Sequence, residues 1–458
     1  MSKLKIIRDP IHKDIKLNEE EISIVDMPEI QRLRNIKQTG LTCLVYPSAN
    51  HTRFEHSIGT MHVAGEIAKN LENIDKNLTK IVALLHDIGH PPFSHTLEVA
   101  GYDHEEFTKE KIKRMNFENY TSKEVLDVYS SKGLEGSLIH GDVDADRMDY
   151  LVRDSHHTGV AYGSIDIPRL IRSIVVIEDT NKLGIIEKGR TTVESLLTAR
   201  YQMYPTVYMH PTSRISETMI KNATIDAIKD DIFKLRDLSL MDDIDLICTL
   251  RRSEGSSNEI MRKIDARDLF KSISVQRYNE LSPKERWNLI NLSENELGII
   301  ENEMSDFFGS RIFLDIPKPP KMAEHRITVI MGDKKQRLDE ISPLAESLKE
   351  AYKKSWSVMV YSEPETAKKS SEIVKDKNKF LFDFISDEII DNNILNVLNE
   401  QGTVQGVTKL AGLVKKSPND TEFHSELQKL IFCGLVDKKV EPVRGTYRYD
   451  YTAAQLDD

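Results

Sequence analysis

Three histidines and an aspartate lie close together in one short stretch of this chain. The stretch His86-Asp87-Ile88-Gly89-His90-Pro91-Pro92-Phe93-Ser94-His95 holds an adjacent His-Asp pair and two further histidines. Imidazole and carboxylate groups are ligands that borderline and hard divalent cations accept. The pattern therefore predicts a divalent-metal site, and the alternative interpretation is a pair of surface histidines beside a helix end.

The neighbouring residues predict how this stretch is held. Apolar residues recur at helix-like spacing over residues 78–85, so the His-Asp pair is expected to close a buried helix. Gly89 is expected to cap that helix, because glycine readily adopts the left-handed conformation of such caps. Pro91-Pro92 should then end the helix and turn the chain so that His90 and His95 face one cavity.

Two other segments can supply further ligands. His56 lies in the first turn of a helix predicted upstream, and the segment 142–154 alternates acids with apolar residues in a helical pattern. Asp144 and Asp146 would point to nearly opposite sides of such a helix, so only one of them is expected to bind the metal. The residues alone thus predict His56, the His86-Asp87 pair and one of these two aspartates.

These segments are similar to those of the HD-domain phosphohydrolases, in particular the deoxynucleoside triphosphate (dNTP) triphosphohydrolase branch, which includes mammalian enzymes with a sterile-alpha-motif domain. The similarity begins at 5–12, continues through 31–38 and the motifs above, reaches 200–210, and fades after about residue 280. It implies a mainly α fold with an HD-domain helical core and small β elements. It also implies metal-dependent hydrolysis of dNTPs to deoxynucleoside and inorganic triphosphate.

The resemblance assigns the ligands of the metal and of the substrate. It selects Asp146 over Asp144, which becomes a structural or outer acid. The metal ligands are then His56, His86, Asp87 and Asp146, a set that permits Fe, Mn, Zn, Co or Mg. The residues that match substrate contacts are Arg53, Gln38, Arg147, Tyr150, Asp154, Arg200 and Tyr208. The three arginines would offset the charge of a triphosphate.

The resemblance also assigns the catalytic group. His95 is expected to be the catalytic histidine, positioned by Glu98, while His90 and His104 complete the cavity around the α-phosphate. A positioned histidine that protonates the departing oxygen typically contributes ~10²- to 10⁴-fold. Attack at the α-phosphorus follows from the resemblance alone.

A regulatory nucleotide site is a further implication of the resemblance. The matching residues are Lys5, Asp26, Gln31, Arg34, Arg169, Lys188, Arg267 and Lys271, and the implied activator is GTP or dGTP. Ile186 and Pro211 depart from this pattern, because they stand where basic residues would be expected. The alternative for residues 31–34 is an ordinary solvated helix face. Such sites lie between subunits in the family, so a homodimer or homotetramer is expected.

Composition limits the remaining classes. The chain has 458 residues, enough for two or three domains, with 39% hydrophobic and 30% charged residues. No apolar run reaches the ~18 residues of a membrane span, and no signal-peptide core is recognisable, so we expect a cytoplasmic protein without a membrane partner. A net charge of -11 argues against broad nucleic-acid binding. Cys43, Cys248 and Cys433 are far apart and are expected to be packed free thiols.

The predicted organisation has three parts. They are an HD-domain catalytic core (1–280), a helical and α+β extension (281–385) and a winged-helix-like module (386–458). Strands are expected at 174–178, 326–331 and 357–361, with helices at 389–400, 405–415 and 420–433 and paired strands at 435–440 and 446–451 around Arg444-Gly445. Acids and bases nearly cancel in the last module, which favours oligomerisation or docking over DNA binding.

Two alternatives to dNTP hydrolysis stay open. An HD phosphohydrolase could act on a nucleoside monophosphate or another phosphoester, although a monophosphate needs fewer cations than Arg53, Arg147 and Arg200 provide. A nucleotide-sensing, DNA-associated regulator would instead act through the winged-helix-like module. The complete set of expected ligands and the histidine at position 95 argue against a catalytically inactive core.

Overall fold

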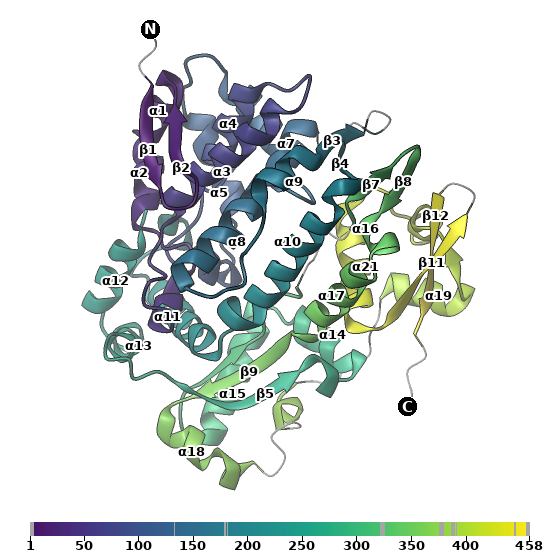
Figure 1. The fold of residues 1–458 in the computed structure, drawn as a ribbon. Coiled ribbons are helices and arrows are strands. Elements are labelled where there is room, and N and C mark those ends of the chain that lie inside the picture. The colour runs from purple at the N-terminus through teal and green to yellow at the C-terminus, as the bar shows by residue number, and fades with distance from the viewer. Residues whose placement is uncertain are drawn as a thin grey trace. The chain divides into compact units, whose positions relative to one another are not determined.

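The structure is a computed structural model that describes residues 4–131, 133–177, 180, 182–320, 326–374, 380–385, 390, 392–443 and 446–454. The fold is mainly α with small sheets, as predicted (Figure 1). The chain forms two compact units. The first comprises Met1–Phe270 and Met322–Tyr352, and the second comprises Lys271–Lys321 and Lys353–Asp458. Part of the predicted extension therefore folds with the HD core and part with the C-terminal segment.

Three helices form the centre of the first unit. Helix α3 (Arg53–Lys69) packs against α4 (Lys76–Leu85) and α8 (Ala145–Thr158). Asp75 caps the start of α4 and Asp144 caps the start of α8, each by accepting backbone N–H groups of the first turn. These caps fix where the helices begin. The first turns of α3 and α8 and the residues that directly follow α4 carry the predicted ligands.

The other elements of the first unit surround this centre. They are β1 (Lys5–Asp9), β2 (Lys13–Leu17), α1 (Glu19–Val25), α2 (Pro28–Arg32), α5 (His104–Arg114), α6 (Ser122–Ser130), α7 (Leu134–His140), α9 (Ile167–Ser173), β3 (Ile174–Ile177), β4 (Lys182–Ile186), α10 (Arg190–Met203), α11 (Pro211–Lys229), α12 (Asp243–Arg252), α13 (Ser256–Asp265), β7 (Thr328–Met331), β8 (Lys334–Arg337), α16 (Leu338–Ile341) and α17 (Pro343–Lys354). A 3-10 segment, Ser94–Ala100, follows the His-Asp turn. Strands β1 and β2 form an antiparallel hairpin, and the order β3-β4-β7-β8 makes a four-stranded sheet.

The second unit contains two small sheets and the C-terminal helices. Its elements are β5 (Lys271–Arg277), α14 (Pro283–Asn291), α15 (Glu294–Phe308), β6 (Ile312–Asp315), β9 (Ser357–Ser362), α18 (Pro364–Ile373), α19 (Asn393–Gln401), β10 (Val404–Gln405), α20 (Val407–Leu413), α21 (Thr421–Cys433), β11 (Val436–Val443) and β12 (Thr446–Ala453). The sheet orders are β5-β9-β6 and β10-β12-β11. The three predicted C-terminal helices and the strand pair are present, whereas the predicted turn at Arg444-Gly445 lies outside the described residues. A winged-helix assignment stays a prediction.

Several smaller predictions can be compared with the structure. The strands expected near 174, 326 and 357 are present as β3, β7 and β9, although the hairpin β1–β2 and strands β5 and β6 were not predicted. Cys43, Cys248 and Cys433 are free thiols, and Cys433 is buried. Among the described helices, none combines the length and apolar character needed to cross a membrane.

The predicted role of Gly89 as a left-handed helix cap is wrong. Helix α4 ends at Leu85 with His86 in the right-handed helical region, and the left-handed backbone lies at Phe93 (φ 56°) and Ser94 (φ 59°) instead. Gly89 is needed for close packing, because a Cβ there would lie 2.3 Å from the carbonyl oxygen of His104.

We therefore expect Gly89→Ala to destabilise the protein by ~2 kcal/mol or more, since the contact is with backbone that cannot rotate away. Chemical denaturation followed by circular dichroism measures the effect. The control is Gly298→Ala within α15, where a Cβ meets nothing within 4 Å and helix propensity predicts a gain of ~0.5–1 kcal/mol. Equal stability of the Gly89→Ala variant and the wild type would contradict the packing argument.

Candidate active site

Ligand atoms from three helices converge in the first unit. His56 Nε2 lies 3.0 Å from Asp146 Oδ1, and His86 Nε2 lies 3.9 Å from the same oxygen. Potential ligand atoms of the three residues all lie within 4.8 Å of one another. The buried Nε2 of His86 has no hydrogen-bond partner among the described residues. Two imidazole nitrogens and a carboxylate oxygen thus face one point, and this donor set fits a divalent cation.

Hydrogen bonds on the far side of each ring hold both histidines in place. The carbonyl of Ala83 accepts the Nδ1–H of His86 at 2.8 Å, and Asp149 Oδ2 accepts the Nδ1–H of His56 at 2.8 Å. Because both acceptors require a proton on Nδ1, the neutral form of each ring carries its lone pair on Nε2, where a metal can replace a proton. Outer hydrogen bonds of this kind orient metal-binding histidines.

Asp149 is the centre of a buried polar network that sequence reasoning did not assign to the site. It is fully buried and accepts hydrogen bonds from His12 Nε2 at 2.7 Å and from two nitrogens of Arg153 at 2.8 Å. Arg153 Nη1 also pairs with Asp9 at 2.8 Å. The only sequence signal was the position of Asp149, three residues after a predicted ligand and hence on the same helix face.

Gly59 makes room for this network. A Cβ at Gly59 would lie 1.9 Å from Asp149 Oδ1 and 2.4 Å from Arg153 Nη2. Any larger residue would have to displace a buried ion pair. The lack of a side chain at this position on α3 is therefore part of how His56 is oriented.

The charges of the cluster favour a cation. Burial alone would lower the pKa of His56, but hydrogen bonds to Asp146 and Asp149 outweigh it and raise the pKa to about 10. Burial would likewise raise the pKa of Asp146, yet the hydrogen bond with His56 lowers the pKa to about 2. The two carboxylates thus create a negative potential around the imidazole.

Asp87 lies beside this cluster and links it to Arg53. Its Oδ1 is 3.3 Å from Nε2 of both His86 and His90, and its Oδ2 pairs with Arg53 Nη1. Arg53 Nε donates to Ser94 Oγ at 2.7 Å, and the buried Nη2 has no partner among the described residues. Arg53 therefore anchors the turn through two nitrogens and keeps a third for a ligand.

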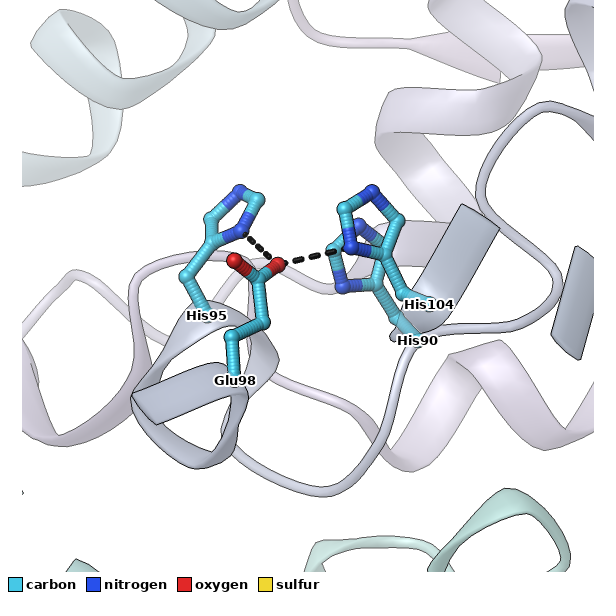
Figure 2. A group of neighbouring side chains, drawn as sticks. All are labelled: His90, His95, Glu98 and His104. Atoms are coloured by element: carbon cyan, nitrogen blue, oxygen red, sulfur yellow. Dashed lines mark hydrogen bonds and ion pairs between the residues drawn. The ribbon is translucent and has the colours of Figure 1, made fainter. Parts of the chain in front are cut away.

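The predicted catalytic residues form a second group, shown in Figure 2. Glu98 Oε1 accepts the Nδ1–H groups of His95 at 2.5 Å and of His104 at 2.7 Å, and the ring of His90 stacks on that of His104 with centroids 4.0 Å apart. The side chain of His95 is 65% exposed. Burial alone would raise the pKa of Glu98, but these hydrogen bonds hold the pKa well below its usual range.

Distant residues hold the turn that carries these histidines. Asp243 Oδ1 accepts the N–H of left-handed Phe93 at 2.7 Å, and Ser94 Oγ donates to the carbonyl of Lys37 at 2.6 Å. Arg32 Nη2 donates to the carbonyls of Ile88 and His90 at 2.9 and 2.7 Å. Sequence reasoning assigned neither Asp243 nor Arg32 to the site.

Two of the predicted sugar contacts, Tyr208 and Asp154, bond to each other. Tyr208 donates its hydroxyl to Asp154 Oδ2 at 2.7 Å, and His51, which was not predicted, donates Nε2–H to Oδ1 at 2.8 Å. The N–H of Gln38 donates to the carbonyl of His51, while its buried Oε1 has no partner among the described residues. The ring of Tyr150 lies 6.4 Å from that of His56.

The other two predicted phosphate cations have partners within the protein. Arg147 Nη1 pairs with Asp144 and donates to the carbonyl of Gly141 at 2.5 Å. The guanidinium of Arg200 lies 5.6 Å from the centroid of the Tyr352 ring. Contact with a phosphate would require Arg147 to share or exchange its partners.

Two of the predicted activator residues contact each other directly. Arg34 Nε donates to Gln31 Oε1 at 2.8 Å, and its guanidinium lies 3.6 Å from the centroid of the Phe54 ring. Gln31 Nε2 in turn donates to the carbonyl of Val25. Asp26 is the C-cap residue that directly follows α1.

The remaining activator residues are spread along the chain. Arg169 Nη2 donates to the carbonyl of Lys188 at 3.5 Å, and Arg267 Nη2 donates to the carbonyl of Leu44 at 3.1 Å. Lys5 begins β1, whereas Lys271 begins β5 in the second unit. Within the first unit, the contacts described for these activator residues are therefore separate pairs and do not form one cluster.

Family models of known proteins match the segment of the chain that carries the predicted metal ligands. Residues 53–154 match the HD domain and residues 165–380 match the HD associated region. A protein of Methanocaldococcus jannaschii, MJ1154, is 50% identical over 97% of this chain and 98% of its own length.

The chain belongs to the HD-domain family.

Relatives within this family include dNTP triphosphohydrolases. The SAMHD1 homolog of Dictyostelium discoideum is 31% identical over 66% of this chain, and human SAMHD1 is 27% identical over 59% of it. The chain spans 66% and 55% of the lengths of these two relatives. The HD domain and these relatives support a hydrolase of the dNTPase-like branch.

Solved structures show the same fold. A hypothetical protein from Aquifex aeolicus has a TM-score of 0.67 at 29% identity, and the match covers 81% of this chain and 100% of that one. A phosphohydrolase from Bacteroides thetaiotaomicron has a TM-score of 0.63 at 27% identity, covering 79% of this chain and 100% of that one.

A lysine near the His-Asp turn gives a pH-dependent prediction. Burial lowers the pKa of Lys111 from 10.5 to about 7, and its Nζ donates to the carbonyl of Ser239 at 2.7 Å. Between pH 7 and 10.5 the unfolded chain binds a proton that the folded chain does not, so stability should rise with pH.

Across pH 7.5–9.5, wild type should therefore gain about 1 kcal/mol per pH unit relative to Lys111→Met, as measured by urea unfolding. Lys113→Met, at an exposed position on the same helix, serves as the control and should follow wild type. If wild type and Lys111→Met share one pH profile, the burial argument fails.

Proposed function

We propose that the protein is a metal-dependent dNTP triphosphohydrolase that releases deoxynucleoside and inorganic triphosphate, with a guanine nucleotide, GTP or dGTP, as activator. The carrying observation is that three buried polar atoms around the His-Asp turn lack hydrogen-bond partners among the described residues: His86 Nε2, Arg53 Nη2 and Gln38 Oε1. Such atoms are costly to bury unless a ligand satisfies them. A metal, a phosphate and a sugar hydroxyl match the three in chemical type.

His56, His86, Asp87 and Asp146 would hold the metal, since their donor atoms lie together and the outer hydrogen bonds leave each Nε2 available. When bound, a divalent ion supplies a water of lowered pKa and polarises a phosphoryl oxygen. Asp149 maintains the orientation of His56 throughout, because the position of His56 Nδ1 is fixed by its hydrogen bond.

His95 is suited to move a proton. Its Nδ1–H is held by Glu98, so the Nε2 edge of the exposed ring can carry the proton given to the departing 5′ oxygen. The carboxylate of Glu98 stabilises the positively charged ring before the transfer. Glu98 also holds His104, which keeps the two histidines at a fixed separation.

Substrate contacts follow from the same groups. Arg53 Nη2 would bind a phosphate oxygen, with Arg147 and Arg200 as further cations. Asp154 and Tyr208 form a hydrogen-bonded pair that can bind a sugar hydroxyl, and Gln38 offers a side-chain oxygen that has no hydrogen-bond partner among the described residues. Close packing of these side chains around the sugar would disfavour the additional hydroxyl of ribose.

Product analysis tests the proposed reaction. Metal-loaded protein incubated with each dNTP, with and without GTP, should yield deoxynucleoside plus intact triphosphate on anion-exchange chromatography. GTP should increase the rate, and Gln31→Ala should reduce that increase. Diphosphate or monophosphate products would indicate another HD hydrolase, and no product would favour a nucleotide-sensing protein.

Two variants should separate metal binding from proton transfer. His86→Ala combined with Asp87→Ala should abolish both bound metal and turnover, since it removes donors from the ligand cluster. His95→Asn should retain the metal and lose ~10²- to 10⁴-fold in kcat. Metal content by mass spectrometry and initial rates give the two readouts. Turnover that survives in the double variant would refute the site assignment.

A further inference from the structure

A second group of potential metal ligands lies outside the His56, His86 and Asp146 cluster. Potential ligand atoms of His90, His95, Glu98 and His104 all lie within 4.8 Å of one another. Figure 2 shows Glu98 between the rings of His95 and His104, with His90 beside His104. Three imidazoles and a carboxylate are a donor set that favours Zn²⁺ and similar divalent transition metals over Mg²⁺.

His90 supplies an independent indication of a ligand. Its side chain is 1% exposed, and its buried Nδ1 has no hydrogen-bond partner among the described residues. Asp87 Oδ1 lies 3.3 Å from the opposite nitrogen, Nε2, so the proton of the neutral ring belongs on Nε2. The Nδ1 lone pair is then directed away from Asp87 and is available to a cation, as in other carboxylate-oriented metal histidines.

The four side chains are carried by backbone that is already fixed. The carbonyl of His90 accepts a hydrogen bond from Arg32, and Asp243 holds the left-handed turn immediately before His95 and Glu98. His104 is the first residue of α5, which Asp103 caps by accepting two backbone N–H groups. Ligands on fixed backbone lose little conformational freedom when a metal binds.

We propose that His90, His95, Glu98 and His104 form a second metal site, which binds Zn²⁺ or a similar divalent transition metal and inhibits the enzyme. On binding, the rings of His90 and His104 leave their stacked arrangement and turn toward the ion. The Nδ1 protons that His95 and His104 now donate to Glu98 move to Nε2, or are released where the ring is doubly protonated, and the three Nδ1 atoms and a Glu98 oxygen become the ligands. The inhibitory consequence rests on the proposed function, because His95 bound to a metal through Nδ1 cannot become the doubly protonated ring that gives a proton to the departing oxygen. The binding itself does not depend on that function.

Metal stoichiometry tests the site without any turnover. The full chain is freed of metal with a chelator, dialysed against Zn²⁺, and analysed by mass spectrometry for Zn²⁺ per chain. Wild type should bind two equivalents, and Glu98→Gln and His95→Ala should each lose one. His56→Ala should also lose one, but from the other cluster, so a double variant should lose both.

His156→Ala is the matched control, because His156 is an exposed histidine outside both clusters. It should keep two equivalents, and circular dichroism should show that every variant is folded. Co²⁺ spectroscopy identifies the site in His56→Ala: nitrogen-rich, four-coordinate absorption should remain there and disappear when Glu98→Gln is added. A single equivalent in wild type, or two equivalents in both Glu98→Gln and His95→Ala, would overturn the proposal.

A rate measurement then distinguishes the inhibitory role from the proposed reaction. With Mn²⁺ as the activating metal, added Zn²⁺ should reduce dNTP turnover at the concentration at which the second equivalent binds. Zn²⁺ binding at the second site without a change in rate would overturn inhibition alone. Lack of turnover under all conditions, with two equivalents still bound, would overturn the proposed function and leave the second site intact.

Discussion

The buried carboxylate of Asp149 is the constraint on which the active site depends. A buried charge is costly unless it is paired and hydrogen-bonded, and Asp149 meets that requirement through His12, His56 and Arg153. These partners join the β1–β2 hairpin to α3 and α8. Because one of them is the ring of His56, the same contacts that stabilise the fold also direct Nε2 of that ring toward Asp146. Loss of Asp149 would therefore disturb stability and metal geometry together.

The catalytic group depends on a different set of supports. Two of its histidines, His90 and His95, flank a short turn with two left-handed residues, Phe93 and Ser94, whereas His104 begins α5. Such backbone persists only when its surroundings hold it, and here Asp243, Arg32 and Arg53 do so. The two clusters meet at Asp87, which contacts histidines of both. This arrangement allows a rigid ligand set and a partly exposed histidine to lie within a few residues of each other.

Much of this organisation could be predicted from the sequence, and the exceptions have physical reasons. Apolar periodicity predicted α3, α4 and the C-terminal helices. The hairpin β1–β2 consists largely of exposed, charged residues, and its only alternation, Ile15-Lys16-Leu17, is too short to predict a strand. Gly89 was assigned to a cap because local rules favour it, whereas packing against α5 decides its role. The two clusters were predicted from residue types, their spacing and a family resemblance. The contact of Asp149 with His12 was missed, since the two residues are 137 positions apart and no local pattern connects them.

The most direct test of the account is anomalous diffraction from crystals that contain Mn²⁺ and a dNTP analogue that cannot be hydrolysed. The account predicts an anomalous peak within about 2.0–2.3 Å of Nε2 of His56 and His86 and of a carboxylate oxygen of Asp146, with the α-phosphate beside it and the sugar near Asp154. A metal bound elsewhere, or a nucleotide that leaves Arg53 and His95 without phosphate contacts, would contradict the account.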